Sequence, residues 1–183
     1  MRRELESVLV ATSQLLDEGG LAAVTVDEIS ARSGVSAASI LELWPNPYAI
    51  AAEAFGRQAA EAIPLPDTGS AASDLSELAR RVSEFYSGRS GTTVLQLIAA
   101  CAVDRDTAGH FREFFLTGRR ANVAELWQRA IDRGEVDVEI DVETAADLLF
   151  GPLIFRLICG HAPLRAAEAD ALTLAALHGL LAK

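Results

Sequence analysis

Few side chains in this sequence could serve as nucleophiles, general bases or metal ligands. Apart from the carboxylates there are three histidines and two cysteines. Cys101 and Cys159 form no spaced pair, and Cys159 and His161 stand two positions apart on an expected helix, so their side chains point in nearly opposite directions. Gly88 and Gly91 lack the strand and the lysine that a phosphate-binding loop requires. The sequence therefore predicts no enzyme, and neither a metal nor a cofactor.

Charge and hydropathy narrow the class of protein further. The 183 residues include 16 Lys and Arg against 26 Asp and Glu, a net charge of −10. Such a chain repels nucleic acid and acidic membranes at long range, which excludes a nonspecific nucleic-acid coat protein. The apolar run from Leu148 to Cys159 carries Arg156 and is too short to span a membrane. Because the sequence shows no signal peptide and no disulfide framework, we expect a cytoplasmic protein without a membrane partner.

Helical periodicity runs through the whole chain, so we expect an all-α protein of about nine helices. The first helix ends at Gly19-Gly20, and the second begins after Thr25, which forms a capping box with Glu28. A third helix begins after Ser36 and must end before Pro45. Three short helices therefore fit within the first 45 residues.

The remaining helices are longer. A fourth is expected over 47–63, followed by a hinge over 64–73 that contains Pro, Gly and Ser. The alternating stretch 136–140 has no partner strand and is expected to be a connector. Helical patterns predict further helices near 72–87, 92–104, 106–133, 142–161 and 166–182.

The second and third helices have the sequence shape of a helix-turn-helix. In that motif the second helix enters the major groove of DNA. Short helix pairs also occur in many helical bundles, so the pattern alone leaves open both a DNA-binding and a purely structural interpretation.

Longer segments resemble a known family. The N-terminal part is similar, in order and spacing, to the DNA-binding domain of the tetracycline repressor (TetR) family of regulators, in Val8-Leu9-Val10-Ala11, Leu15-Leu16-Asp17-Glu18-Gly19-Gly20, Val24-Thr25-Val26-Asp27-Glu28-Ile29, Gly34-Val35-Ser36 and Trp44-Pro45-Asn46. The C-terminal part resembles one branch of that family in Arg119-Arg120, in residues 130–136, in residues 148–157 and in Pro163-Leu164.

The resemblance implies a homodimeric transcriptional regulator, in the usual case a repressor. Residues 1–46 would form a helix-turn-helix domain that binds a palindromic operator. Residues 47–183 would form a helical ligand-binding and dimerisation domain, with the helix 47–63 connecting the two. A small-molecule effector would release the protein from DNA.

The resemblance also implies which residues contact DNA. Seven positions at the second and third helices match or adjoin the family's DNA contacts: Thr25, Arg32, Ser36, Ala37, Ala38, Ser39 and Leu41. Family members usually carry a tyrosine, a basic or histidine residue and a lysine where this chain has Leu41, Leu43 and Pro47. Residues 1–60 also hold four arginines against eight acids, although phosphate contacts normally require a basic surface.

Two interpretations of this departure remain open. Either the head binds DNA with few cations, through Arg2, Arg3, Arg32 and the two serines, or it has kept the fold and lost its operator, leaving a ligand-binding or protein-interaction dimer. We favour retained DNA binding, with an affinity that falls unusually little as salt rises. If Leu41 and Leu43 pack inward, they make no contact with DNA. If they are exposed, they could contact thymine methyl groups.

Apolar side chains on the middle helices could line an effector pocket. The candidates are Phe85, Leu97, Cys101, Phe111, Phe115, Trp127 and Phe150. Few charges fall on these faces, so the pattern favours an apolar or lightly polar effector. Each of these residues could equally be an ordinary core residue.

The last two expected helices are unusually apolar. We expect them to form a symmetric dimer interface through Leu153, Leu157, Leu174, Leu177 and Leu181. Burial inside a single chain is the alternative explanation of the same pattern.

Overall fold

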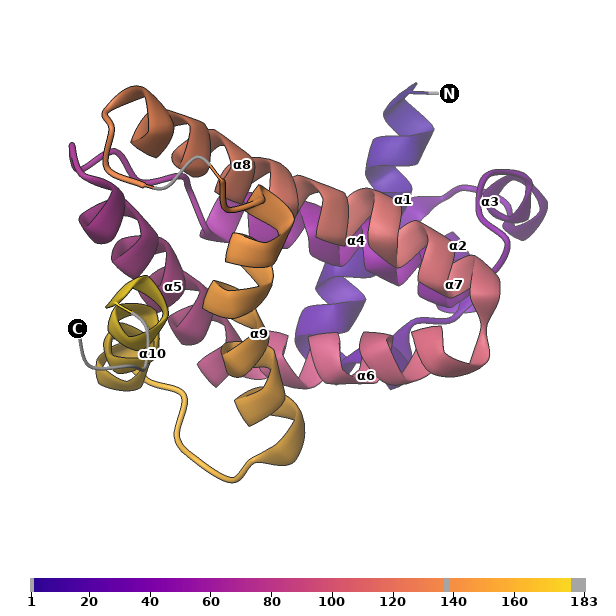
Figure 1. The fold of residues 1–183 in the computed structure, drawn as a ribbon. Helices are drawn as coiled ribbons and strands as arrows, with labels where there is room; N and C mark the ends of the chain where they lie inside the picture. The colour runs from indigo at the N-terminus through magenta and orange to yellow at the C-terminus, as the bar shows by residue number, and fades with distance from the viewer. Residues whose placement is uncertain (1, 137–138, 179–183) are drawn as a thin grey trace. The chain divides into compact units, whose positions relative to one another are not determined.

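The computed structural model describes residues 2–136 and 139–178. That part of the chain is all-α, as the sequence predicted, and contains no strand. The expected helix 106–133 is a continuous run made of α7 (Arg105–His110), a π-helical turn η2 (Phe111–Leu116) and α8 (Thr117–Asp132). With this run counted once, the described part holds nine helices (Figure 1). None of the described helices has the length and apolarity needed to cross a bilayer.

The chain divides into two compact units. Unit 1 comprises Met1–Ala62 and Arg89–Gly118, and unit 2 comprises Ile63–Gly88 and Arg119–Lys183. The boundary near residue 63 falls just before the stretch expected to be a hinge. Unit 1 therefore contains the expected helix-turn-helix together with a later segment of the chain.

Unit 1 is built around buried aliphatic and aromatic side chains, among them Leu15, Ile29, Ile40, Ile50 and Phe55. Helix α1 packs on α2 and α4, and α2 packs on α3, so the three N-terminal helices share one core. Its elements are α1 (Arg2–Gly19), the 3₁₀ turn η1 (Leu21–Ala23), α2 (Val26–Ser33), α3 (Ala37–Leu43), α4 (Pro47–Ala62), α6 (Arg89–Val103), α7 and η2.

The π-helical turn η2 was not expected from sequence. At its end the backbone N–H and the hydroxyl of Thr117 both bond to the carbonyl of Arg112, the hydroxyl at 2.8 Å. A Cβ atom on Gly56 would lie 2.3 Å from the carbonyl oxygen of Phe114, so only glycine allows α4 to approach this turn so closely. The ring of Phe115 stacks near those of Phe55 and Phe111, with centroids 5.3 and 4.8 Å away.

Unit 2 consists of α5 (Ala71–Ser87), α8 from Arg119 onward, α9 (Val142–Cys159) and α10 (Ala166–His178). Asp141 caps the start of α9 by accepting a hydrogen bond from the N–H of Thr144 at 3.1 Å. Helix α10 packs against α5 and α9. The prediction of this last helix beyond 178 falls outside the described residues.

A buried carboxylate holds the start of α5 in unit 2. Asp74 is fully buried and accepts hydrogen bonds from the N–H and hydroxyl of Thr68, at 2.6 and 2.7 Å, and from Arg133 at 3.2 Å. Burial alone would raise the pKa of Asp74, but these donors outweigh it and hold the pKa below its ordinary value. The stretch before α5 is therefore tied, through one acid, to the residue that follows α8.

Candidate functional site

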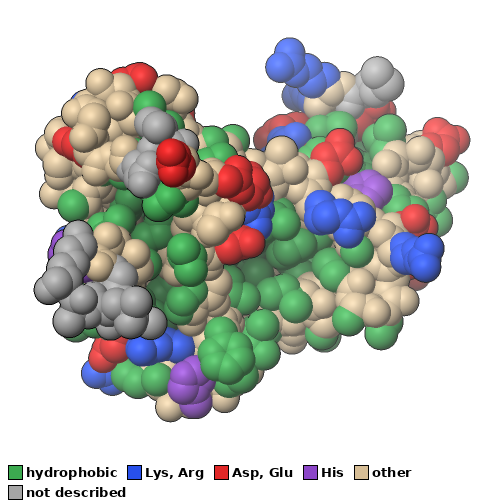
Figure 2. All heavy atoms as spheres, in the orientation of Figure 1, with side chains coloured by type: hydrophobic (Ala, Val, Ile, Leu, Met, Phe, Trp, Pro, Cys, Tyr) green, Lys and Arg blue, Asp and Glu red, His purple; other side chains and the backbone are tan. Residues whose placement is uncertain are grey.

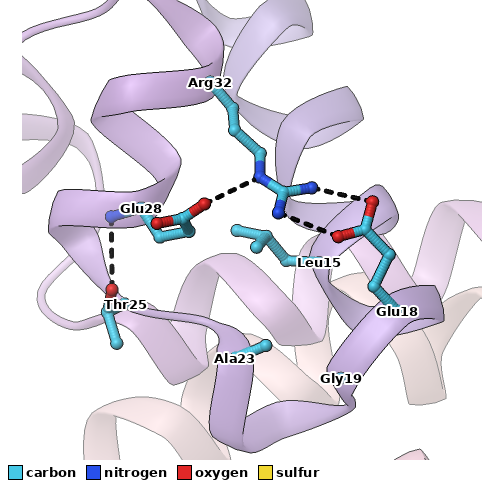
Figure 3. A pocket seen from close by; sticks show the side chains of 7 residues that line it. All are labelled: Leu15, Glu18, Gly19, Ala23, Thr25, Glu28 and Arg32. Carbon is cyan, nitrogen blue, oxygen red and sulfur yellow. Dashed lines mark hydrogen bonds and ion pairs between the residues drawn. The ribbon is translucent and has the colours of Figure 1, made fainter.

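Local hydrogen bonds define both helices of the helix-turn-helix. The Thr25 hydroxyl accepts from the N–H of Glu28 at 3.2 Å, which confirms one half of the predicted capping box. The Glu28 carboxylate turns toward Arg32 (Figure 3). Gly34 ends α2 in the left-handed conformation, with φ of 73°. Ser36 then caps α3 by accepting from the N–H of Ser39 at 3.2 Å.

The inner side of α3 is anchored to the body of unit 1. Ile40 is fully buried, and the indole N–H of Trp44 donates to the buried carboxylate of Glu53 at 2.8 Å. Arg57 bonds to the other oxygen of Glu53 at 3.3 Å and to Glu6 at 2.8 Å. This chain of contacts fixes the end of α3 against α4 and α1, so the rest of α3 faces outward.

The outward side of α3 carries hydroxyl and apolar groups. Ser36, Ala38 and Ser39 are exposed, and Ala37 is half-buried. Leu41 and Leu43 are 49% and 47% exposed, so neither leucine fills the core. Of the two arrangements considered for these leucines, the structure has the exposed one.

Tyr48 is a further exposed residue beside this surface. It lies in the first turn of α4, five positions after Leu43, and is 42% exposed. It was not among the expected contacts, because an aromatic residue after Asn46-Pro47 reads in sequence as part of a helix core. A tyrosine hydroxyl at such a position is able to donate to a phosphate oxygen.

Arg32 is the expected cation of the interface, and its charge is neutralised within the protein. Its guanidinium bonds to Glu18 at 2.8 Å and to Glu28 at 3.0 Å, and these hydrogen bonds, the one to Glu18 above all, raise the pKa of Arg32 (Figure 3). The group borders a shallow depression of about 450 Å³ lined by Leu15, Glu18, Gly19, Ala23, Thr25, Glu28 and Arg32.

Other cations of unit 1 are also held internally. Arg57 is paired as described above, and Arg89 donates to the carbonyls of Asp17 and Glu18. Arg2 and Arg3 are exposed, and neither has an ion pair within the described residues. On the face drawn in Figure 2, Lys and Arg side chains are scattered among Asp and Glu and gather in no patch.

Asn46 links the turn after α3 to the start of α7. Its side-chain oxygen accepts from the N–H of Ala49 at 2.8 Å and so caps α4. Its amide donates to Asp104 at 2.9 Å, and Asp104 in turn caps α7 by accepting from the N–H of Thr107 at 2.7 Å. The hydroxyl of Thr107 is the main cause of the lowered pKa of Asp104. A displacement of the residues between α6 and α7 would therefore act, through Asn46, on the turn that follows α3.

The expected ligand-lining residues fall in both units. In unit 1, Leu97 and Phe115 are buried, whereas Cys101 and Phe111 keep partial exposure, and burial raises the pKa of the Cys101 thiol. In unit 2, Trp127 is buried, and Phe85 and Phe150 are partly exposed. That these seven residues line one effector site stays a prediction.

Arg119 is a polar residue of unit 2 that sequence reasoning missed. One of its guanidinium nitrogens, Nη1, is buried without a hydrogen-bond partner, and so is the indole nitrogen of Trp127. No sequence signal distinguishes Arg119 from the adjacent Arg120, which is paired. No group of three His, Cys, Asp or Glu suited to a metal ion occurs within 2–136 and 139–178.

The expected dimer residues differ in exposure. Leu153 is fully buried inside unit 2 and offers no surface to a partner, whereas Leu157 and Leu177 are half-buried and Leu174 is exposed. Leu181 lies outside the described residues. Three other apolar residues of α9 are exposed: Leu148, Phe155 and Ile158. Their spacing of seven and three positions places them on one helix face.

Comparison with known proteins accounts for nearly the whole chain. The model of the tetR family of bacterial regulatory proteins matches residues 8–62, and the model of the tetracyclin repressor-like C-terminal domain matches residues 65–176. The chain belongs to the TetR family. This TetR family regulator has a helix-turn-helix DNA-binding part and a C-terminal ligand-binding domain, which confirms the resemblance noted from its sequence.

Individual relatives agree with this assignment. The regulator is 36% identical to the HTH-type transcriptional regulator YdeS of Bacillus subtilis over 153 residues, which cover 84% of this chain and 77% of YdeS. It is 29% identical to the regulator Rv1556 of Mycobacterium tuberculosis, over 88% of this chain and 79% of that protein.

Solved structures share the fold. The TetR family transcription regulator SCO0332 matches with a TM-score of 0.90 and 29% identity, over 97% of this chain and 98% of that one. FadR of Thermus thermophilus, solved in complex with lauroyl-CoA, matches with a TM-score of 0.75 at 20% identity, over 98% and 96% of the two chains. At that identity the likeness to FadR concerns the fold alone.

Proposed function

We propose that this TetR family regulator is a homodimeric repressor that binds a palindromic operator through α3 and leaves it when a small, mostly apolar effector binds. The observation that carries the proposal is the outward side of α3, where hydroxyl groups and aliphatic side chains stand exposed on a helix anchored from behind. A rigid helix of this kind can enter a major groove.

The proposed readout depends on few charges. Ser36 and Ser39 offer hydroxyls to phosphates or base edges, and Ala38, Leu41 and Leu43 offer aliphatic surface to thymine methyl groups. Thr25 and Tyr48 supply further hydroxyls at the flanks. Because Arg32 is neutralised by Glu18 and Glu28, we expect the affinity to depend weakly on salt.

The proposed dimer uses the exposed apolar face of α9 and α10. Leu148, Phe155 and Ile158 on α9 and Leu174 on α10 leave apolar area that a second copy would cover. Leu157 and Leu177 would lie at the margin of that surface. A two-fold dimer presents its two α3 helices symmetrically, which is the reason to expect a palindromic site.

The effector is proposed to bind in the C-terminal domain against partly exposed aromatic residues such as Phe85 and Phe150. The complexes of FadR proteins with stearoyl-CoA and lauroyl-CoA belong to proteins that share only the fold with this chain, so they do not identify its ligand.

The charges of the N-terminal DNA-binding part support a second candidate function. A TetR-like dimer that binds ligand or protein and has lost specific DNA binding would have the same fold and dimer face. The ion pairs of Arg32 and Arg57, in a segment with twice as many acids as arginines, favour this alternative.

Selection of bound sequences from a random duplex library separates the two functions. Purified protein is used at low and at near-physiological salt, and the selection is repeated with Ser39→Glu, whose carboxylate would face DNA phosphate. Ser73→Glu is the matched control, because Ser70 and Ser73 cap α5 with the same pair of hydrogen bonds as Ser36 and Ser39 at α3.

We expect a palindrome to be enriched by the wild type and by Ser73→Glu, and the affinity of Ser39→Glu for it to fall by roughly two orders of magnitude. If protein shown to be a folded dimer enriches no sequence at either salt concentration, the second function, a dimer without specific DNA binding, is favoured. Equal losses in both variants would mean that α3 is not the reading helix.

A further inference from the structure

Two adjacent arginines at the start of α8 have opposite surroundings. Arg120 is bound by two acids of α9, Glu143 and Asp147, the latter at 2.6 Å. Arg119 has no hydrogen bond and no ion pair within the described residues, although its Nη1 atom is buried. Four other arginines of unit 2 follow the pattern of Arg120, namely Arg80 with Asp170, Arg81 with Glu77, Arg129 with Glu125 and Arg133 with Asp74. Arg156 donates to the carbonyl of Pro163, and Arg165 is exposed to solvent.

No acid within residues 2–136 and 139–178 forms an ion pair with Arg119. The titratable neighbour that acts on its pKa is Tyr86 of α5, which is itself buried. Burial lowers the pKa of Arg119, and burial also raises the pKa of Tyr86 well above its ordinary value, so the phenol stays neutral and cannot balance the guanidinium. A guanidinium remains charged under all ordinary conditions, so the group is a partly buried cation without a counter-charge.

A second donor without an acceptor lies on the same helix. The indole N–H of Trp127 is buried and unbonded, eight residues or about 12 Å further along α8. Buried donors are nearly always satisfied in folded proteins, so two on one helix point to a missing acceptor. Three further buried atoms lack a hydrogen-bond partner: the hydroxyls of Ser83 and Thr173 and the carboxylate oxygen Oε2 of Glu168. They lie on α5 and α10, which pack against each other, and not on α8.

We propose that Arg119 is the anchor for an organic monoanion, a carboxylate attached to an apolar body, which is the effector class of this regulator. The inference rests on the proposed effector-binding function and replaces the expectation of a lightly polar ligand with a charged one. A monoanion fits because only one of the two guanidinium groups at the start of α8 needs a counter-charge: Arg120 is already balanced by Glu143 and Asp147. The partial exposure of Arg119 leaves it reachable by a ligand.

Ligand binding tests the charge requirement directly. The probes are octanoate and 3-phenylpropionate, their neutral partners octanamide and 3-phenylpropionamide, and octyl phosphate as an alternative anion. Binding to the full-length protein is followed by calorimetry and by the rise in Tm with ligand concentration. We expect at least one carboxylate to bind about tenfold or more tightly than its amide, and octyl phosphate to bind no better than octanoate.

Two variants give a readout that a purely structural arginine would not give. Arg119→Met keeps the length of the side chain but removes the unpaired charge, so it should raise the Tm of the ligand-free protein and abolish the preference for carboxylate over amide. Arg120→Met, the matched control, loses two ion pairs and should lower the Tm while keeping the preference.

The outcomes separate this inference from the function beneath it. Equal binding of carboxylate and amide, tighter binding of octyl phosphate, or a lower Tm for Arg119→Met would overturn the carboxylate anchor and leave the effector proposal standing. Failure of every probe, charged and neutral, would overturn the effector proposal and this inference with it.

Discussion

Arg32 and Arg119 are cations in opposite electrostatic situations, one in each unit of the molecule. Arg32, beside the helix-turn-helix, faces solvent yet is held by two carboxylates. Arg119, on α8, is partly withdrawn from solvent and has no carboxylate partner in the part of the chain that the structure describes. Arg32, at the proposed DNA-binding surface, therefore has its charge balanced by acids. Within the described residues, Arg119 of the ligand-binding domain keeps a positive charge that no acid balances.

The difference between Arg32 and Arg119 indicates which unit needs a bound ligand to balance its charge. A buried unpaired cation is unfavourable unless something else supplies the anion, so unit 2 has an electrostatic reason to bind an anionic ligand. Unit 1 has no comparable surplus, and its recognition helix presents hydroxyls and aliphatic groups. Specificity on DNA would then come from shape and apolar contact more than from phosphate attraction.

The largest effect is expected where unit 2 does pair its charges. Asp74→Asn removes a buried carboxylate that accepts from Thr68 and Arg133, and should lower the free energy of unfolding at pH 7 by about 1–3 kcal/mol. Urea unfolding measures it. Asp67→Asn is the control, since Asp67 is exposed and 3.8 Å from Arg129, and should change stability little.

The same variant carries a prediction for pH. Because the pKa of Asp74 is lower in the folded protein than in the unfolded chain, its contribution is complete above the unfolded pKa near 4 and is lost as the pH falls further. The difference in unfolding free energy between wild type and Asp74→Asn should therefore shrink below about pH 4. A difference that grows in acid would contradict the lowered pKa.

A smaller effect is expected from the aliphatic groups of α3. Leu41→Ala should weaken binding to the selected operator by about fivefold, equivalent to roughly 1 kcal/mol of apolar contact, without changing the salt dependence. Fluorescence anisotropy measures the affinity on operators in which thymine is replaced by uracil. If Leu41 contacts a thymine methyl, one such uracil operator should weaken wild-type binding and leave the variant unaffected. Additive losses at every position would rule out that contact.

The smallest effect is expected from releasing Arg32. Glu18→Gln removes one of its two partners, and should raise operator affinity at low salt by about threefold and steepen the logarithmic salt slope by at most about 1. Glu125→Gln, which alters the net charge equally but removes a partner of Arg129 in unit 2, is the control. Identical gains in both variants would show that net charge matters and that Arg32 has no special place at the DNA.

Much of the fold could be predicted from the sequence. Thr25 and Ser36 mark the starts of two helices where the sequence placed them, and the first helix ends at Gly19, as the Gly19-Gly20 pair predicted. The π-helical turn η2 was missed because it depends on α4 approaching closely at Gly56, a contact between segments 58 residues apart.

The candidate sites were harder to predict from the sequence. Leu41 and Leu43 could have been core or surface, since residues two apart on a short helix satisfy neither pattern clearly, and only packing around Ile40 and Trp44 leaves them exposed. On α9, Leu153 lies in the core whereas Phe155 is exposed, although both belong to one apolar run. A helix that is apolar nearly all round does not reveal which face its own unit covers.

The sequence by itself determined the family, the all-helical class and the ends of most helices, because caps and glycine turns act between residues a few positions apart. Only the tertiary structure decided which charges are free. Arg32 meets Glu18 from 14 positions away and Arg120 meets Glu143 from 23, while Arg119 meets no acid among the described residues. Ion pairing joins residues that only folding brings together, and Arg119 and Arg120 are the same residue type at adjacent positions, so their opposite electrostatic situations could not be read from the chain.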